Sequence, residues 1–297
     1  MVSYILLSSF AVGQELVGSL VTEIMRLPSL TSLSLSFNNF RGPLPMDYSR
    51  LENLNLQYNQ ITGLIPIGFF ANAPSLRFLN IGSNIFVGTI PSDVGMASNM
   101  QYLYIFENLL GGQLPLSIYN LPLVEFRAQG NFLGGSLPLD SLSAKNNNGW
   151  ERQLQTLWLS DNGLVGTLPR VLASFTNLRD LVLGGNAFYG ALSSSLSQLS
   201  LLERLDVSDN DLVGAVPSEL ALLPSLESLK LGLNQFSGAL PDSLCTIFSI
   251  RPLELEADCL PLDGPSNQCL CCTICCDRAT NMCQAEQVDS AVDGLNP

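Results

Sequence analysis

A repeat runs through almost the whole chain and is clearest in residues 226–241, which read LESLKLGLNQFSGALP. Leucines at the spacing LxxLxL are followed at fixed distances by an Asn, an apolar residue, a Gly and a Leu-Pro pair. Self-similarity at a fixed period of this kind is the signature of a solenoid, in which each repeat forms one coil. The Asn recurs nine times, at intervals of 21 to 31 residues: Asn38, Asn59, Asn84, Asn108, Asn131, Asn162, Asn186, Asn210 and Asn234.

The recurring residue types describe a coil of backbone. Alternating leucines form a short strand with one face inward, because side chains point to opposite faces with period two. Stacked coils pair these strands in parallel and merge the leucines into one core. An Asn amide both donates and accepts, so we predict a ladder of asparagines that satisfies backbone groups left unpaired by the turn. The Gly suits a close backbone approach or a positive φ, and the Leu-Pro fits the extended outer side of the coil.

The motif LxxLxLxxNxFxGxLP resembles the plant-type leucine-rich repeat over about residues 2–258. That repeat occurs in extracellular domains of receptor-like kinases and receptor-like proteins, and in inhibitors of cell-wall-degrading enzymes. The resemblance implies an α/β-type right-handed superhelix that is mostly β, with short 3-10 or helical outer segments. It also implies a parallel sheet of about 11 short strands on the concave face. Function is less constrained, because it depends on surface residues that the repeat does not fix.

Composition excludes several classes of function. Lys and Arg number 13 against 26 acidic residues, for a net charge of −13, whereas nucleic-acid binding needs a basic footprint. Cationic partners remain possible. The chain has no His, which is the commonest general base and metal ligand. We therefore predict no catalytic residue, no cofactor and no metal. No apolar run reaches the roughly 18–20 residues of a membrane-spanning helix.

The domain organisation is predicted from the repeat boundaries. Residues 1–258 form one solenoid, with a degenerate first coil in which Phe10 stands at the Asn position, nine regular coils and a final half coil. The alternative for the N-terminus is a signal peptide, because YILLSSFAV has a suitable length, although no basic residue precedes it. A solenoid without a cap exposes a sheet edge. We therefore hypothesise that Met1 lies inside a longer protein that carries the cap and any signal or anchor.

Two departures from the repeat have structural predictions. The spacing lengthens between Leu142 and Leu154, where SAKNNNGWER is polar and turn-prone. We predict a surface loop there, either as a tolerated insertion or as a functional one. At the end of the solenoid, Ile250, Leu253 and Leu255 are predicted to form the last strand, with Asp258 at the Asn position.

The cysteines gather near the C-terminus and predict a cap over residues 245–283. An even number of clustered cysteines is typical of disulfides in an oxidising compartment, and similar cysteine-rich ends close plant and algal leucine-rich repeat domains. A thiolate metal site remains an alternative, because CTIC at 272–275 has zinc-ligand spacing. The sequence does not determine which of these cysteines pair with one another. Residues 284–297 are predicted to be a disordered acidic tail. The eight cysteines are Cys245, Cys259, Cys269, Cys271, Cys272, Cys275, Cys276 and Cys283.

A candidate ligand site lies on the concave face, where the outward strand positions are free of the repeat. Aligning the coils brings together six residues of types enriched at binding hot spots: Phe78, Tyr102, Tyr104, Phe106, Arg127 and Trp158. The alternative is that these aromatics only stack on one another across the sheet. An acidic zone follows and is predicted to be a solvated face. It comprises Glu203, Asp206, Asp209, Glu227, Glu254 and Glu256.

These observations predict a non-enzymatic recognition module, extracellular or at the cell surface. By its resemblance it is a receptor-like ectodomain that binds a peptide, protein or glycan on its concave face. The alternative is a secreted enzyme inhibitor or a structural protein of the cell wall or matrix.

Overall fold

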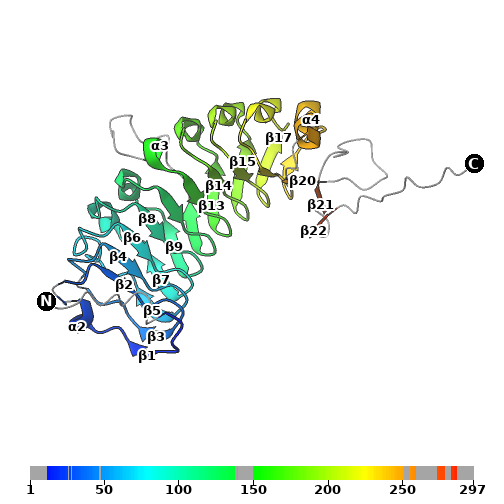
Figure 1. Cartoon of the computed structure of the whole chain (residues 1–297). Coiled ribbons are helices and arrows are strands. Elements are labelled where there is room, and N and C mark those ends of the chain that lie inside the picture. Colours follow the sequence, from blue (N-terminus) through cyan, green and yellow to red (C-terminus); the bar gives the residue numbers. More distant parts are fainter. Residues whose placement is uncertain are drawn as a thin grey trace, which may run out of the picture.

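The computed structural model describes residues 12–25, 27, 29–46, 48–137, 139, 150–250, 254–258, 273–277 and 282–285. Within these residues the chain is a curved solenoid of stacked coils (Figure 1). Several predicted features lie outside the described residues: the strand before Phe10, most of the insertion, four of the cysteines (Cys259, Cys269, Cys271 and Cys272) and most of the tail.

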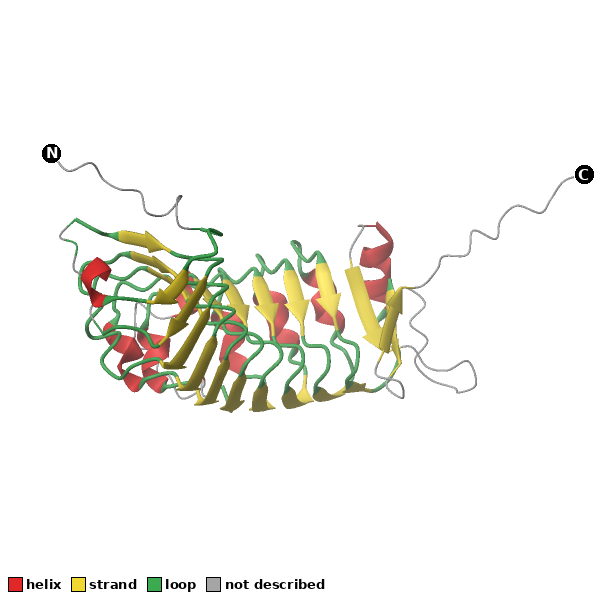
Figure 2. Ribbon diagram, turned by 90° about the horizontal axis from the view of Figure 1, so that it is seen from below, coloured by secondary structure: helices red, strands yellow, loops and turns green. Residues whose placement is uncertain are grey.

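The concave sheet contains the LxL strands of successive coils, one beside the next (Figure 2). Its twelve strands pair in parallel from β2 to β21, and β22 is antiparallel to β21. The predicted parallel sheet is therefore confirmed. In order along the sheet, the strands are β2 (Ser32–Ser34), β4 (Asn53–Asn55), β6 (Phe78–Asn80), β8 (Tyr102–Tyr104), β10 (Glu125–Arg127), β12 (Thr156–Trp158), β14 (Asp180–Val182), β16 (Arg204–Asp206), β18 (Ser228–Lys230), β20 (Glu254–Asp258), β21 (Ile274–Asp277) and β22 (Met282–Ala285).

A second sheet, which the sequence analysis did not predict, has ten strands. Nine of its strands follow a ladder Asn, and β1 precedes the first of them. In these segments a Gly with positive φ interrupts the alternation that would signal a strand; Gly88 has φ 82° and Gly112 has φ 73°. The strands are β1 (Val17–Ser19), β3 (Asn39–Gly42), β5 (Gln60–Leu64), β7 (Ile85–Thr89), β9 (Leu109–Gln113), β11 (Phe132–Gly135), β13 (Gly163–Thr167), β15 (Ala187–Ala191), β17 (Asp211–Gly214) and β19 (Gln235–Phe236).

Short helical segments complete the coils on the convex side (Figures 1 and 2). Pro91, Pro115, Pro169 and Pro217 each precede a 3-10 turn, because the fixed φ of Pro suits the start of a helical segment. The segments are α2 (Thr22–Met25), η1 (Ser92–Met96), η2 (Leu116–Asn120), α3 (Trp150–Gln153), η4 (Arg170–Ser174), η5 (Ser194–Gln198), η6 (Ser218–Leu222) and α4 (Asp242–Ile250). None of the helices in the described part combines the length and hydropathy that a membrane crossing requires.

The nine asparagines form a chain of hydrogen bonds through the solenoid. Asn108 is representative: its Nδ2 donates to the carbonyl oxygens of Ile105 and Phe106 in its own coil, at 3.2 and 3.0 Å, and of Ile81 in the preceding coil, at 3.0 Å. Its Oδ1 accepts from the Phe86 backbone N–H at 3.0 Å. The same four bonds recur at every ladder Asn from Asn59 to Asn234.

The register predicted for the last strand was wrong by two residues. Leu255 pairs with Leu229, whereas the predicted pattern of Ile250, Leu253 and Leu255 set Leu253 at that position. The preceding outer segment is α4 with nine residues, in place of a 3-10 turn of five, and this longer segment moves the strand along the chain. Asp258 consequently does not occupy the Asn position. Its carboxylate instead accepts from the backbone N–H groups of Leu233 and Asn234, at 2.5 and 3.1 Å, and so caps the last coil of the ladder.

The surface-loop prediction for SAKNNNGWER was wrong at its C-terminal end. Trp150 begins helix α3 and is only 2% exposed. Its ring packs against Tyr119 at 4.7 Å and Phe126 at 5.7 Å between centroids, and its Nε1 donates to the Ile118 carbonyl at 3.2 Å. An indole buries a large apolar area and finds a partner for its one N–H here, so this residue belongs to the core.

Candidate functional site

The six predicted concave residues come from four neighbouring strands and the turn after β8. Strand pairing sets Phe78 beside Tyr102, Tyr104 beside Arg127, and Arg127 beside Trp158. Phe106 follows β8 by two residues. All six side chains are half-buried. Because these four strands are three residues long and in register, a ligand lying across the coils would meet these side chains in succession.

The aromatic rings contact one another. The Phe78 ring lies 6.2 Å from that of Tyr102 and 5.4 Å from that of Tyr104, the second pair in an edge-to-face arrangement. Such pairs contribute about 0.5–1.5 kcal/mol beyond their buried area. These contacts agree with the stacking interpretation of the cluster, and they also hold the rings in fixed positions.

Arg127 is held from three sides. Its guanidinium carbon lies 5.1 Å from the centroid of Tyr104 and 4.4 Å from that of Trp158. Its Nε and Nη2 donate to Glu125 Oε2 at 3.1 and 2.8 Å. The Tyr104 hydroxyl donates to the same oxygen at 2.7 Å. Burial and this hydrogen bond to Glu125 raise the pKa of Tyr104 well above its usual range, so that the phenol stays protonated as the donor.

Sequence reasoning missed three residues of this region: Phe37, Tyr58 and Glu125. The Phe37 and Tyr58 rings stack at 4.5 Å, and Tyr58 meets Phe106 at 6.5 Å. Both side chains are well exposed, at 50% and 43%, and both residues precede a ladder Asn with a left-handed backbone, at φ 57° and 54°. The sequence feature that could have indicated these two residues is an aromatic directly before the ladder Asn in two successive coils. Glu125 lies two residues before Arg127 on the same strand, but only the structure shows that it bonds to two neighbouring side chains.

A glycine makes room for Phe106. A Cβ on Gly82 would lie 2.4 Å from the Phe106 ring, closer than real contacts allow. The absence of a side chain at Gly82 therefore lets Phe106 lie over the backbone of the preceding coil. We define the aromatic patch as the six predicted residues together with Phe37 and Tyr58.

Beyond Trp158 the concave face becomes acidic. Lys230 Nζ lies 3.2 Å from a carboxylate oxygen of Glu254 and 3.6 Å from one of Glu256, and Arg204 lies 3.8 Å from Asp180. Burial raises the pKa of Asp180 and of Glu256. Asp206 uses Oδ1 to accept from the Ser208 backbone N–H and hydroxyl, at 3.0 and 2.6 Å. Among the described residues of this half the carboxylates therefore outnumber the cations, and Arg204 and Lys230 already have acidic partners.

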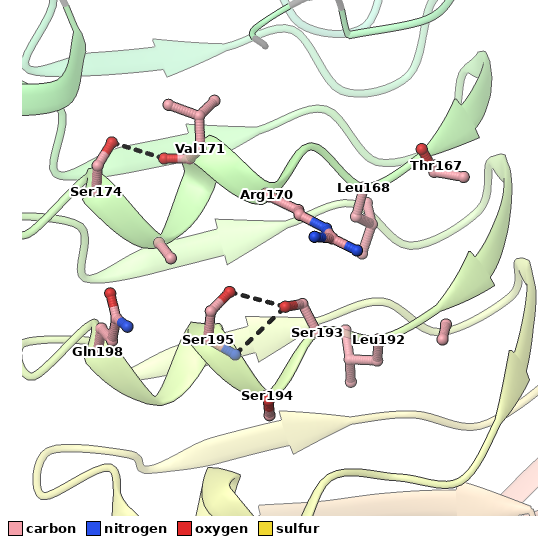
Figure 3. A pocket seen from close by; sticks show the side chains of 12 residues that line it. Thr167, Leu168, Arg170, Val171, Ser174, Leu192, Ser193, Ser194, Ser195 and Gln198 are labelled. Atoms are coloured by element: carbon pink, nitrogen blue, oxygen red, sulfur yellow. Dashed lines mark hydrogen bonds between the residues drawn. The ribbon is translucent and has the colours of Figure 1, made fainter.

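A groove of about 820 Å³ opens on the convex side between η4 and η5 (Figure 3). Small side chains line it, including Ala173, Ala191 and Ser194. Ser193 precedes η5 at the position that Pro169 has before η4. Its Oγ caps η5 by accepting from the Ser195 N–H at 3.3 Å. The Arg170 guanidinium lies between the two turns (Figure 3). The groove lies outside the predicted site.

The outer face of the second sheet exposes apolar side chains in successive coils. These positions fall on alternate residues of its strands, on the side away from the core. The exposed apolar residues are Leu64, Ile85, Val87, Leu109, Phe132, Val165, Tyr189 and Val213. Runs of apolar surface on this scale are uncommon unless they contact a partner.

Comparison with known proteins identifies the repeat. A family model described as Leucine Rich Repeat matches residues 29–51, 50–72 and 153–175. Receptor-like protein 35 of Arabidopsis thaliana is 36% identical over 236 residues, which cover 65% of this chain and 24% of that protein. Pollen receptor-like kinase 2 of the same plant is 31% identical over 156 residues, covering 51% of this chain and 22% of that protein. The chain thus spans about a quarter of the length of the curated relatives it matches.

Solved structures with the same architecture include receptor ectodomains. The plant peptide hormone receptor RGFR1 in complex with RGF2 has a TM-score of 0.71 and 25% identity, covering 86% of this chain and 39% of that one. The Arabidopsis receptor kinase HAESA in complex with the peptide hormone IDA and a co-receptor has a TM-score of 0.70 and 26% identity, covering 85% and 40%. A plant ice-binding protein has a TM-score of 0.63 and 29% identity, covering 76% and 71%.

Proposed function

We propose that this chain, a leucine-rich repeat solenoid similar to plant receptor-like proteins, is a non-enzymatic extracellular recognition module whose ligand lies along the concave face. The observation that carries the proposal is the aromatic patch, with its rings and Arg127 fixed across neighbouring strands. Fixed aromatic and Arg side chains are the residue types that dominate binding energy at interfaces, and fixing them in advance reduces the entropy lost on binding.

The class of ligand is proposed from similar proteins. Two structures that share the architecture are complexes with peptide hormones, and a peptide is long enough to cross several coils. We therefore propose a peptide or an extended protein segment first, with a glycan as the alternative chemistry. The extracellular location is likewise proposed from these relatives, and the disulfide bond of Cys245 agrees with an oxidising compartment. We also propose that the remaining cysteines of residues 245–283 form a disulfide-bonded cap.

Removing the patch is expected to abolish ligand capture. In a variant with Tyr102→Ala, Tyr104→Ala and Trp158→Ala together, the loss of three aromatic contacts should weaken binding at least about a hundredfold, because single hot-spot aromatics contribute about 2 kcal/mol or more. The measurement is a pull-down from extracellular extract with immobilised chain, followed by mass spectrometry. Protease treatment of the extract separates a peptide or protein ligand from a glycan.

The matched control carries Phe132→Ala and Tyr189→Ala. It removes exposed aromatics from the second sheet and leaves the concave face intact. Circular dichroism and thermal unfolding verify that both variants are folded. Equal capture by the wild type and the triple variant would rule out the patch as the recognition site.

A second candidate function is favoured by the second sheet. Its outer face carries mainly uncharged side chains in a parallel array, with strands about 4.8 Å apart, and a plant ice-binding protein has a similar fold over 71% of its own length. An evenly spaced surface of this kind suits an ordered solid. If the chain binds ice through this face, it should slow ice recrystallisation, and Thr62→Lys with Val87→Lys should remove that effect. The triple concave variant should retain it, since the concave sheet is separate. Recrystallisation equal to that in a buffer control would exclude this candidate.

A further inference from the structure

In the described part of the concave face, three basic side chains have an acidic partner within the chain. Arg127 contacts Glu125 at 2.8 Å, Arg204 lies 3.8 Å from Asp180, and Lys230 lies between Glu254 and Glu256. A ligand carboxylate that approached one of these cations would lie beside the carboxylate already paired with it. The repulsion between two like charges at a half-buried site is unfavourable.

Glu125 has the central place in the aromatic patch. Its Oε2 accepts the two Arg127 bonds and the Tyr104 hydroxyl together, and its side chain is 24% exposed. The Arg127 side chain, at 31% exposed, is additionally covered by the Tyr104 and Trp158 rings. Glu125 therefore neutralises the cation of the patch and fixes the orientation of a ring that the ligand would contact.

We propose that Glu125 sets the charge preference of the concave face by holding Arg127 in an ion pair. The face then selects a peptide segment that has an apolar or aromatic part and a neighbouring cationic group. It rejects a segment that presents a carboxylate. This inference rests on the proposed function and concerns the same site. The apolar part lies on the aromatic patch. The cationic group lies toward β14 to β20, where the Asp206 carboxylate accepts hydrogen bonds from Ser208.

The geometry predicts the effect of removing one charge. In Glu125→Gln the amide oxygen still accepts from Tyr104, so the ring keeps its position, but the ion pair to Arg127 is lost. Arg127 then becomes available to an acidic group of the ligand. Burial of the pair is partial, so we expect a change in charge preference of about five- to tenfold, in the range of ion pairs at semi-exposed sites.

The test is the selection of peptides from a random displayed library on immobilised protein. Four proteins are compared: the wild type, Glu125→Gln, the triple concave variant and Asp211→Asn. Asp211 lies on the second sheet, where Gln235 donates to it, so Asp211→Asn changes the net charge by the same one unit away from the concave face. The triple variant has the net charge of the wild type, and it therefore measures non-specific attraction of cationic peptides to a chain of net charge −13.

The expected result is that peptides selected by the wild type and by Asp211→Asn combine aromatic residues with Lys or Arg. In peptides selected by Glu125→Gln, the ratio of basic to acidic residues should be about five- to tenfold lower than in peptides selected by the wild type. The triple variant should show no aromatic enrichment. If the wild type and Glu125→Gln select the same charges while the triple variant loses its peptides, the assignment of Glu125 is wrong and the proposed function stands. If the wild type and the triple variant enrich the same peptides, or neither enriches any, both the assignment and the proposed function are contradicted.

Discussion

Replacing Asn108 by alanine is expected to lower the free energy of unfolding by about 3 kcal/mol or more, one of the two largest effects in this chain. The Asn108 amide donates to three backbone carbonyls and accepts from one backbone N–H, and its side chain is only 5% exposed. Alanine removes all four bonds and leaves the Phe86 N–H without this acceptor, while each of the three carbonyls keeps one other donor. Each lost hydrogen bond costs about 0.5–1.5 kcal/mol and the unsatisfied N–H about 1–3 kcal/mol, so the sum reaches this size. Urea unfolding followed by circular dichroism measures the change.

A matched control for the ladder is Asn99→Ala. Asn99 is exposed and its Nδ2 donates to the Pro74 carbonyl at 2.9 Å, so we expect a loss of about 1 kcal/mol or less. Asn108→Asp keeps the acceptor for the Phe86 N–H but loses the donors, and it sets a carboxylate against three carbonyl oxygens. It should be no more stable than Asn108→Ala. Equal stability of the Asn99 and Asn108 alanine variants would contradict the importance of the ladder.

Replacing Trp150 by alanine is expected to lower the free energy of unfolding by about 3–5 kcal/mol, the range for a large aromatic removed from a core. The indole is 2% exposed, packs against Tyr119 and Phe126, and donates to the Ile118 carbonyl. Alanine creates a cavity where the lengthened coil meets its neighbour, and it removes one of the two donors to that carbonyl, which also accepts from the Leu121 N–H.

Trp158 provides the contrast for this prediction. It is the other of the two tryptophans in the chain and is half-buried on the concave face. Trp158→Ala should lower stability by about 1–2 kcal/mol, because it loses a cation–π contact and part of its buried area, while it weakens ligand binding. Each variant leaves a single tryptophan, so the fluorescence of the remaining indole follows unfolding. A Trp150→Ala variant as stable as Trp158→Ala would show that the insertion is peripheral to the core.

The errors of the sequence analysis occurred where the spacing of the repeat changes. The second sheet was missed because its strands are short and contain a Gly with positive φ, such as Gly88 and Gly112, which weakens any alternating pattern. The last strand was misaligned because α4 is longer than the turns before it. Trp150 was assigned to a surface loop because its polar sequence neighbours gave no periodicity, and only its packing against Tyr119 and Phe126 shows that it is buried.

For the candidate site, the repeat predicted which residues share a face, and the register of the strands brings those residues together. Repeat spacing could not predict the partners of each side chain. The bonds that join Glu125 to Tyr104 and Arg127 depend on rotamers chosen in three dimensions. The contribution of Tyr58 depends on a left-handed turn that directs its ring toward Phe106.

The sequence by itself determined the solenoid, the parallel concave sheet and the list of residues that face outward. These follow from local periodicity, since an inward Leu or a turn Asn is needed in every coil irrespective of its neighbours. Only the tertiary structure decided the second sheet, the core position of Trp150, the capping role of Asp258 and the neutralisation of Arg127 by Glu125. Each of these depends on which coil lies beside which and at what register, because hydrogen bonds, ion pairs and ring contacts form between residues that are distant in sequence.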